Sequence, residues 1–107
     1  MSDSIRELTS EIRSFVDVRG WYSSGRLDLK GIAISISLES AELLEHFQWV
    51  KDKGLKEYVE EHNHEIADEL ADVAIYVLQF ADRAGIDLGA AIRRKMEKNG
   101  EKYPVEQ

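Results

Sequence analysis

"EIADELADVAIYVLQFADRAG", residues 65–85, is the segment in which polar and apolar residues separate most clearly. At about 100° per residue on a helical wheel, most of its polar side chains fall within a strip roughly 80° wide, with Asp68 just beside it. That strip holds Glu65, Glu69, Asp72, Tyr76, Gln79 and Arg83. The apolar remainder spans roughly 220°, well beyond the ~100° stripe of an ordinary surface helix. The segment therefore predicts a helix covered on several sides, whose acidic strip faces solvent through a slot or lines a cleft.

Helix start and stop signals punctuate the chain on either side of this segment. Ser4 with Glu7 forms a capping-box pattern, Gly85 is a typical helix stop, and Asp87 is a good N-cap. Residues 32–38, IAISISL, alternate as a strand would, but the 3.6-residue pattern that follows favours one long helix. The predicted helices are Ile5–Val18, Leu29–Val50, His64–Ala84 and one that starts after Asp87 and ends near Asn99 or Gly100. The charged connection KDKGLKEYVEEHNH has room for a helical turn. The fold class is all-α, resembling a four-helix bundle.

Composition narrows the class of protein further. A chain of 107 residues is one domain, spanning residues 1–107, with a modest core that favours oligomerisation. The absence of cysteine excludes disulfides and thiolate chemistry. No apolar run approaches the roughly 18 residues of a membrane span, and the polar N-terminus is unlike a signal peptide, so we expect a cytoplasmic protein. The net charge of −7 argues against a nucleic-acid duplex as partner.

A second acidic segment, "SLESAELLEHFQW" at residues 37–49, repeats the carboxylate spacing of the first. Glu39 and Glu42 lie three residues apart, as do Glu69 and Asp72, so each pair projects from one side of its helix. Four carboxylates on two facing helices would be unstable without cations, and oxygen ligands without sulfur suit magnesium or manganese. From spacing alone, a metal site and a solvated acidic face both remain open.

Three segments in order resemble the all-α nucleoside triphosphate pyrophosphohydrolases, the MazG-like enzymes and dCTP pyrophosphatases. "ESAELLEHFQW" is similar to that family's E-x-x-E-L-x-E-x-F-Q-W segment. "EIADELADVAIYVLQFADRAGIDL" is similar to its E-E-L-(A/S)-D-V-L-I-Y-L helix, and "KMEKNGEKYP" to its K-x-x-x-N-x-x-(K/R)-Y-P ending. The resemblance covers residues 5–104. Its departures are Ser40 and Ala41 within the first motif and a poor match at residues 20–30.

The resemblance implies a reaction and a metal. A nucleoside triphosphate would be hydrolysed between its α and β phosphates to the monophosphate and pyrophosphate, with Mg²⁺ or, as an alternative, Mn²⁺. The four matching carboxylates, which the resemblance makes both metal ligands and catalytic residues, are Glu39, Glu42, Glu69 and Asp72. This agrees with the physics, because a triphosphate enters an acidic cleft only with bound cations. Glu45 and Glu65 extend the acidic strips as outer-shell or third-ion ligands.

Six residues are candidate substrate contacts: Trp21, Trp49, Tyr76, Lys95, Asn99 and Lys102. Trp49 would stack on the base, as the F-Q-W segment suggests, and Trp21 could form the other side of a base pocket. Tyr76 would contact the sugar or a phosphate. Lys95, Asn99 and Lys102, near the C-terminus, would contact phosphates. Each has a structural alternative. The tryptophans could be packing aromatics and Tyr76 a dimer-interface residue, and the C-terminal set could complement the helix dipole.

Three functions follow from these patterns. The first is house-cleaning of deoxynucleoside triphosphates, with dCTP as the first expectation and dATP or dUTP as alternatives. The second is phosphoribosyl-ATP pyrophosphohydrolysis, which the F-Q-W segment disfavours. The third is a non-catalytic acidic helical dimerisation module, against which the two carboxylate pairs and the C-terminal Lys-Asn-Lys-Tyr set both argue. The resemblance also implies a homodimer or a dimer of dimers.

Overall fold

The structure is a computed structural model that describes residues 4–21 and 28–105, and within these ranges it contains helices and no strand. The elements are α1 (Ile5–Val18), α2 (Leu29–Phe47), the 3₁₀ turn η1 (Asp52–Gly54), α3 (Leu55–Glu61), α4 (Asn63–Ala84) and α5 (Leu88–Lys102). The predicted all-α class is confirmed. Over the described ranges, no helix has both the length and the apolarity needed to cross a bilayer.

Local signals account for most helix boundaries. Three helices begin with an N-cap residue whose side-chain oxygen accepts a hydrogen bond from a backbone N–H of the first turn. These residues are Ser4 at α1, Asp28 at α2 and Asp87 at α5. α4 ends at Gly85, which has a φ of 70°, a conformation that side-chain-bearing residues rarely adopt. α2 ends at Phe47, three residues before the predicted Val50, because the chain turns there and the Val50 N–H bonds the Phe47 carbonyl. The charged connection holds η1 and α3, more helix than the single turn expected.

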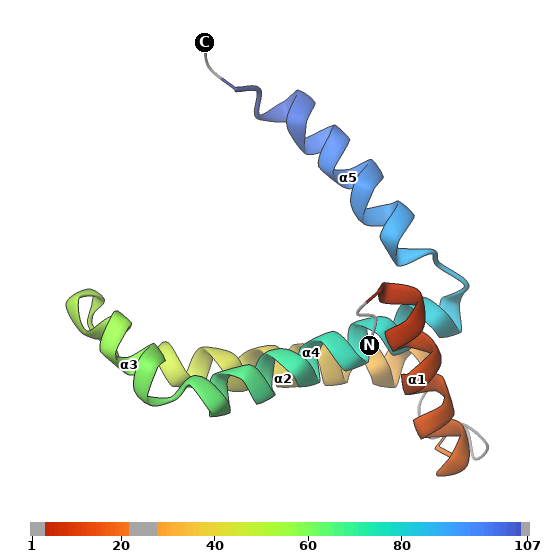
Figure 1. Cartoon of the computed structure of the whole chain (residues 1–107), viewed down its shortest axis with the longest axis horizontal. Helices are drawn as coiled ribbons and strands as arrows, with labels where there is room; N and C mark the ends of the chain where they lie inside the picture. The colour runs from red at the N-terminus through yellow and green to blue at the C-terminus, as the bar shows by residue number, and fades with distance from the viewer. Residues whose placement is uncertain (1–3, 22–27, 106–107) are drawn as a thin grey trace.

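The body of the molecule is built on α2 and α4, which lie antiparallel along their lengths, with α1 crossing the C-terminal half of α4 (Figure 1). The most deeply buried apolar side chains are Val16 of α1, Ile32 of α2, and Ile66 and Ala81 of α4. The predicted central helix is therefore covered from two sides by its neighbours. Two residues of its acidic strip, Glu69 and Asp72, face Glu39 of α2.

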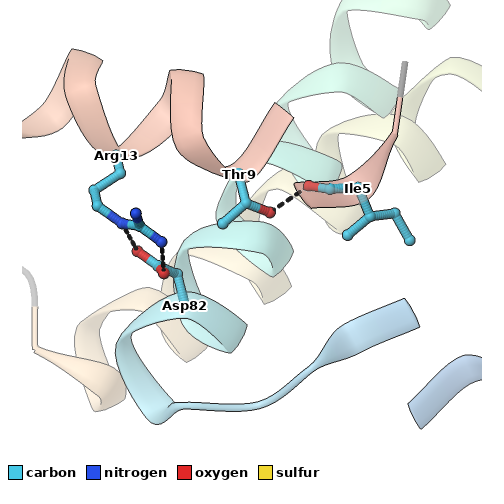
Figure 2. Close-up of polar contacts among 4 residues, drawn as sticks. All are labelled: Ile5, Thr9, Arg13 and Asp82. Carbon is cyan, nitrogen blue, oxygen red and sulfur yellow. Dashed lines mark hydrogen bonds and ion pairs between the residues drawn. The ribbon is translucent and has the colours of Figure 1, made fainter. Parts of the chain in front are cut away.

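An ion pair fastens α1 to the end of α4. Arg13 donates from both Nε and Nη2 to the two carboxylate oxygens of Asp82, with an Nε–Oδ2 distance of 2.9 Å (Figure 2). This bond from Arg13 is the main reason that the pKa of Asp82 lies below its usual value. On the same helix, the Thr9 hydroxyl donates to the Ile5 carbonyl at 2.6 Å. The pair joins the middle of α1 to the last turns of α4.

α5 projects away from this body (Figure 1). Its apolar side chains Ile92 and Met96 are exposed, as is Tyr103 just beyond its end. The radius of gyration is 16.9 Å, whereas a compact chain of this length has about 13 Å. The accessible surface is 8558 Å², whereas a compact monomer of 12.2 kDa exposes about 6,100 Å². A single chain thus leaves about 2,500 Å² more surface uncovered than a compact monomer would.

Candidate metal centre and adjoining pocket

Three carboxylates converge where α2 and α4 pack together. Glu39 comes from α2, and Glu69 and Asp72 come from α4. Each offers one oxygen, and these oxygens all lie within 4.8 Å of one another. Spacing of three residues places Glu69 and Asp72 on one side of α4, and the antiparallel packing brings Glu39 opposite them. We call these three side chains the carboxylate cluster.

The carboxylate cluster is electrostatically unsatisfied. The Oε2 atoms of Glu39 and Glu69 are buried and have no hydrogen-bond partner among the described residues. Burial raises the pKa of Glu39, and the neighbouring charge of Glu42 raises it further. Burial also raises the pKa of Glu69, and the neighbouring carboxylate of Glu42 raises it further. Carboxylates held together in this way favour either protons or a cation.

Glu42, the fourth predicted ligand, borders the carboxylate cluster without belonging to it. Its side chain is more exposed than those of Glu39 and Glu69, yet its charge acts on both. Glu45 and Glu65, expected to extend the acidic strips, are exposed and lie outside the cluster. The structure therefore groups three of the four predicted ligands and leaves the fourth at the edge.

The donor set fits a hard divalent cation. All three cluster ligands are carboxylates, the oxygen donors that magnesium and manganese favour. A bound cation would also satisfy the two orphaned Oε2 atoms and offset the repulsion among the charges. The chemistry of the residues thus matches the ion that the sequence resemblance implies.

An apolar pocket of about 400 Å³ adjoins the carboxylate cluster and shares Asp72 with it. It lies between α1 and α4, and its lining residues are Glu11, Ile12, Phe15, Val16, Trp21, Asp72, Ile75, Tyr76 and Gln79. Trp21 packs edge-on against Phe15, with ring centroids 5.7 Å apart. Two predicted substrate contacts, Trp21 and Tyr76, are therefore brought together beside a predicted metal ligand.

The pocket includes residues for which the sequence suggested no functional role. Phe15 belongs to the apolar stripe of the first helix, which looks like ordinary core until the packing of α1 on α4 is known. Gln79 is buried and lies on the polar strip of α4, so its position on the helical wheel was the available signal. Within the poorly matching segment 20–30, residues 22–27 lie outside the described residues.

The remaining predicted substrate contacts lie away from this pocket. Trp49 follows the end of α2 and is 85% exposed. Lys95, Asn99 and Lys102 lie on the half of α5 farthest from the body, and all three are exposed (Figure 1). One chain does not place these four residues beside the carboxylate cluster.

The fold and the site together define an all-α protein with a candidate divalent-cation centre. The MazG-like family matches residues 34–107, and the chain belongs to this family. A solved pyrophosphatase from Archaeoglobus fulgidus DSM 4304 has the same architecture, with a TM-score of 0.87 and 42% identity. The match covers 98% of this chain and 96% of that one.

Curated relatives agree with the family assignment. The dCTP pyrophosphatase 1 of Rattus norvegicus is 31% identical over 105 residues, which cover 96% of this chain and 59% of the relative. The dCTP pyrophosphatase 1 of Homo sapiens is also 31% identical, again over 96% of this chain and 59% of the relative. The chain therefore spans about three fifths of the length of these relatives.

Proposed function

We propose that the protein is a Mg²⁺-dependent nucleoside triphosphate pyrophosphohydrolase that converts a (deoxy)nucleoside triphosphate and water into the monophosphate and pyrophosphate. The observation that carries this proposal is the sharing of Asp72 between the carboxylate cluster and the apolar pocket. A cation site and a pocket for a flat, apolar ring thus lie side by side, as a nucleotide requires. The relatives named as pyrophosphatases support the same reaction class.

The carboxylates provide the ion site. Glu39, Glu69 and Asp72 would hold Mg²⁺, with Glu42 at the edge as a further ligand. When bound, the cation neutralises phosphate charge and polarises the α-phosphoryl group toward attack. Without it, the negative cluster repels the triphosphate. We therefore expect substrate binding as well as turnover to depend on the metal.

The pocket provides recognition of the nucleoside. Its volume of about 400 Å³ lies within the usual range for small-molecule sites. Trp21 offers a ring for base stacking, and Tyr76 carries a hydroxyl that can reach the sugar or a phosphate. We expect a deoxypyrimidine triphosphate as substrate, with dCTP tested first and with dUTP and dATP as alternatives. The relatives named dCTP pyrophosphatase 1 support that order.

The reaction breaks the bond between the α phosphorus and the oxygen that bridges to the β phosphate. A water oxygen forms the new bond to the α phosphorus, and pyrophosphate leaves with the bridging oxygen. The proton from water passes to one of the carboxylates.

We also propose that the working unit is a homodimer or larger homo-oligomer. The uncovered surface of about 2,500 Å² in excess of a compact monomer is in the range of an obligate interface. Exposed Ile92 and Met96 on the projecting α5 are suited to pack on a second copy. Such an interface is also the route by which Trp49 and the C-terminal Lys95, Asn99 and Lys102 could reach a site.

The test is to incubate the purified protein with each nucleoside triphosphate, with and without Mg²⁺, and to separate the products. Monophosphate plus pyrophosphate, lost on chelation and in Glu69→Gln, is the expected result. The ranking of the bases follows from the same experiment. Diphosphate plus phosphate would refute the assigned bond, and turnover unaffected by chelation would refute the metal site.

A further inference from the structure

The turn that ends α1 brings Trp21 back against the helix it follows. The backbone N–H of Trp21 donates to the Val16 carbonyl at 3.3 Å, and that of Gly20 donates to the Asp17 carbonyl at 3.0 Å. These two bonds define a Schellman motif, in which the residue after the helix cap takes a left-handed conformation. Gly20 has this conformation, with a φ of 63°. The turn therefore places Trp21 beside Val16, and both residues line the pocket between α1 and α4.

A stack of three side chains then holds the ring of Trp21. Phe15 packs against Trp21 with 5.7 Å between ring centroids and an angle of 79° between the ring planes. The guanidinium of Arg19 lies over the Phe15 ring, with Cζ 3.5 Å from the ring centroid. Nη1 of Arg19 also donates to the Phe15 carbonyl at 2.9 Å. We call Phe15, Arg19 and Trp21 the aromatic stack.

Arg19 is the outer member of the aromatic stack. Phe15 and Trp21 line the pocket, whereas Arg19 is exposed and lies outside the lining. The Phe15 side chain is 49% exposed, so burial by itself leaves its ring some freedom. A cation–π contact and a hydrogen bond from the same guanidinium restrain that ring. The restraint passes to Trp21 through the contact between the two rings.

We propose that Arg19 is a positioning residue for base recognition, which holds Phe15 and through it keeps the Trp21 ring facing the pocket. Gly20 brings Trp21 to the aromatic stack, and Arg19 keeps the stack ordered. A ring that is ordered in the free protein binds a flat ligand without the entropic cost of fixing it on binding. The inference rests on the base pocket of the proposed function and extends it to a side chain that does not touch that pocket.

The first experiment measures acrylamide quenching of Trp21 fluorescence in the free protein. A Trp49→Phe background leaves Trp21 as the only tryptophan of the chain. We expect Arg19→Gln to raise the quenching constant of Trp21, because the ring becomes more accessible. Arg6 provides the matched control, since it is exposed on the same helix and lies outside the pocket lining. Arg6→Gln should leave the quenching constant unchanged.

Gly20 and Gly85 form a matched pair of backbone changes. Their φ values are 63° and 70°, so alanine strains either turn in the same way. Gly85 ends α4 and lies outside the pocket lining. We expect Gly20→Ala and Gly85→Ala both to lower the unfolding midpoint. Only Gly20→Ala should also raise the quenching constant of Trp21, which separates the placement of this ring from general loss of stability.

A double-mutant cycle on the KM for dCTP separates positioning from direct contact with substrate. We expect Arg19→Gln to raise the KM about 2- to 5-fold, the equivalent of one exposed cation–π contact, with a smaller effect on kcat. In a Trp21→Ala background, the same change should have no further effect.

Equal increases in KM in the two backgrounds would overturn the proposal, because Arg19 would then act on the substrate directly. An unchanged quenching constant in Arg19→Gln would overturn it as well. A wild type that does not hydrolyse dCTP counts against the substrate of the proposed function, and the quenching experiment alone then decides whether Arg19 positions Trp21.

Discussion

As a ligand of the proposed metal centre, Glu69 would carry a cost to the metal-free fold. Its pKa is raised by burial and by Glu42, so ionising this side chain costs the folded state stability that an exposed glutamate does not cost. We predict that Glu69→Gln raises the unfolding midpoint of the metal-free protein at pH 7 while abolishing the further rise that Mg²⁺ produces in the wild type. Turnover should fall by more than the roughly 10- to 100-fold typical of outer-shell changes. Thermal unfolding with and without Mg²⁺, together with product analysis, checks this.

Glu60, exposed on α3, is the matched control. Glu60→Gln removes the same charge without touching the carboxylate cluster, so it should leave the midpoint, the Mg²⁺ response and the turnover unchanged. A Glu69→Gln protein that is stabilised by Mg²⁺ as much as the wild type would show that Glu69 is not a ligand.

The raised pKa values also set the direction of a pH dependence. A carboxylate whose pKa is raised in the folded state stabilises the fold when the pH is below the pKa of the unfolded chain, about 4.5. This contribution is lost as the pH rises through the pKa of the folded state. We predict that replacing both Glu39 and Glu69 by glutamine stabilises the metal-free protein increasingly as pH rises through that range. The measurement is the difference in unfolding midpoint between the variant and the wild type, taken in chelator. A difference that stays constant with pH would contradict the prediction.

Trp21 contributes an aromatic face to the pocket. Base–aromatic stacking of about 1–3 kcal/mol implies that Trp21→Ala raises the KM for the preferred triphosphate about 5- to 150-fold. The effect on kcat should be smaller, because in the proposed role Trp21 contacts the base and not the reacting phosphate. Trp21→Phe keeps an aromatic face and should recover most of the loss. Steady-state kinetics with equal KM values for Trp21→Ala and the wild type would exclude Trp21 from base recognition.

At the scale of elements, the contact of α1 with α4 forms the pocket, and the Arg13–Asp82 ion pair fastens that contact. The pair is partly solvated, with side chains 53% and 22% exposed. We predict that Asp82→Asn lowers the unfolding midpoint by no more than about 5 °C at pH 7. The pKa of Asp82 is lowered by Arg13, so this contribution is present above the unfolded value of 3.8 and is lost as pH falls through the folded pKa.

Thermal unfolding between pH 7 and pH 2 checks this prediction, with Arg6→Gln as a control. Nη2 of Arg6 lies 3.6 Å from Oδ2 of Asp87, in an ion pair that is more exposed than the Arg13–Asp82 pair. Arg6→Gln should therefore change the unfolding midpoint less than Asp82→Asn does. The prediction is contradicted if the difference in unfolding midpoint between Asp82→Asn and the wild type grows as the pH falls.

At the scale of the whole molecule, exposed apolar surface on α5 predicts self-association. We expect the protein to sediment at no less than twice 12.2 kDa and its unfolding midpoint to rise with protein concentration. Replacing Ile92 and Met96 by glutamate together should shift the sedimenting species toward the monomer, because the two side chains lie one above another on α5. Analytical ultracentrifugation measures both effects.

Arg94 provides the control on the same helix, since it points away from the Ile92 and Met96 side. Arg94→Glu should leave the assembly intact. A wild type that sediments at 12.2 kDa at all concentrations would refute the proposed oligomer. It would also leave Trp49, Lys95, Asn99 and Lys102 without a route to the site.

Periodicity and capping are local properties of the chain, so the sequence by itself determined the all-α class and most helix boundaries. Ser4, Asp87 and Gly85 mark ends that the structure reproduces. The i, i+3 spacing of Glu69 and Asp72 likewise predicted two carboxylates on one face. Ends that depend on a turn in a charged segment, as at Phe47, were placed less accurately, because no strong stop residue marks them.

Only the tertiary structure decided what lies opposite each face. Helical periodicity gives the direction of a side chain around its own axis, but it does not give the register against another helix. The register of α2 on α4 selects Glu39 for the carboxylate cluster and leaves Glu42 at its edge. The crossing of α1 joins Trp21 to Tyr76 and Asp72 in one pocket. The packing of Tyr58 on His46 depends in the same way on how α3 folds back, since contacts between distant segments follow from burial of the whole chain and not from local spacing.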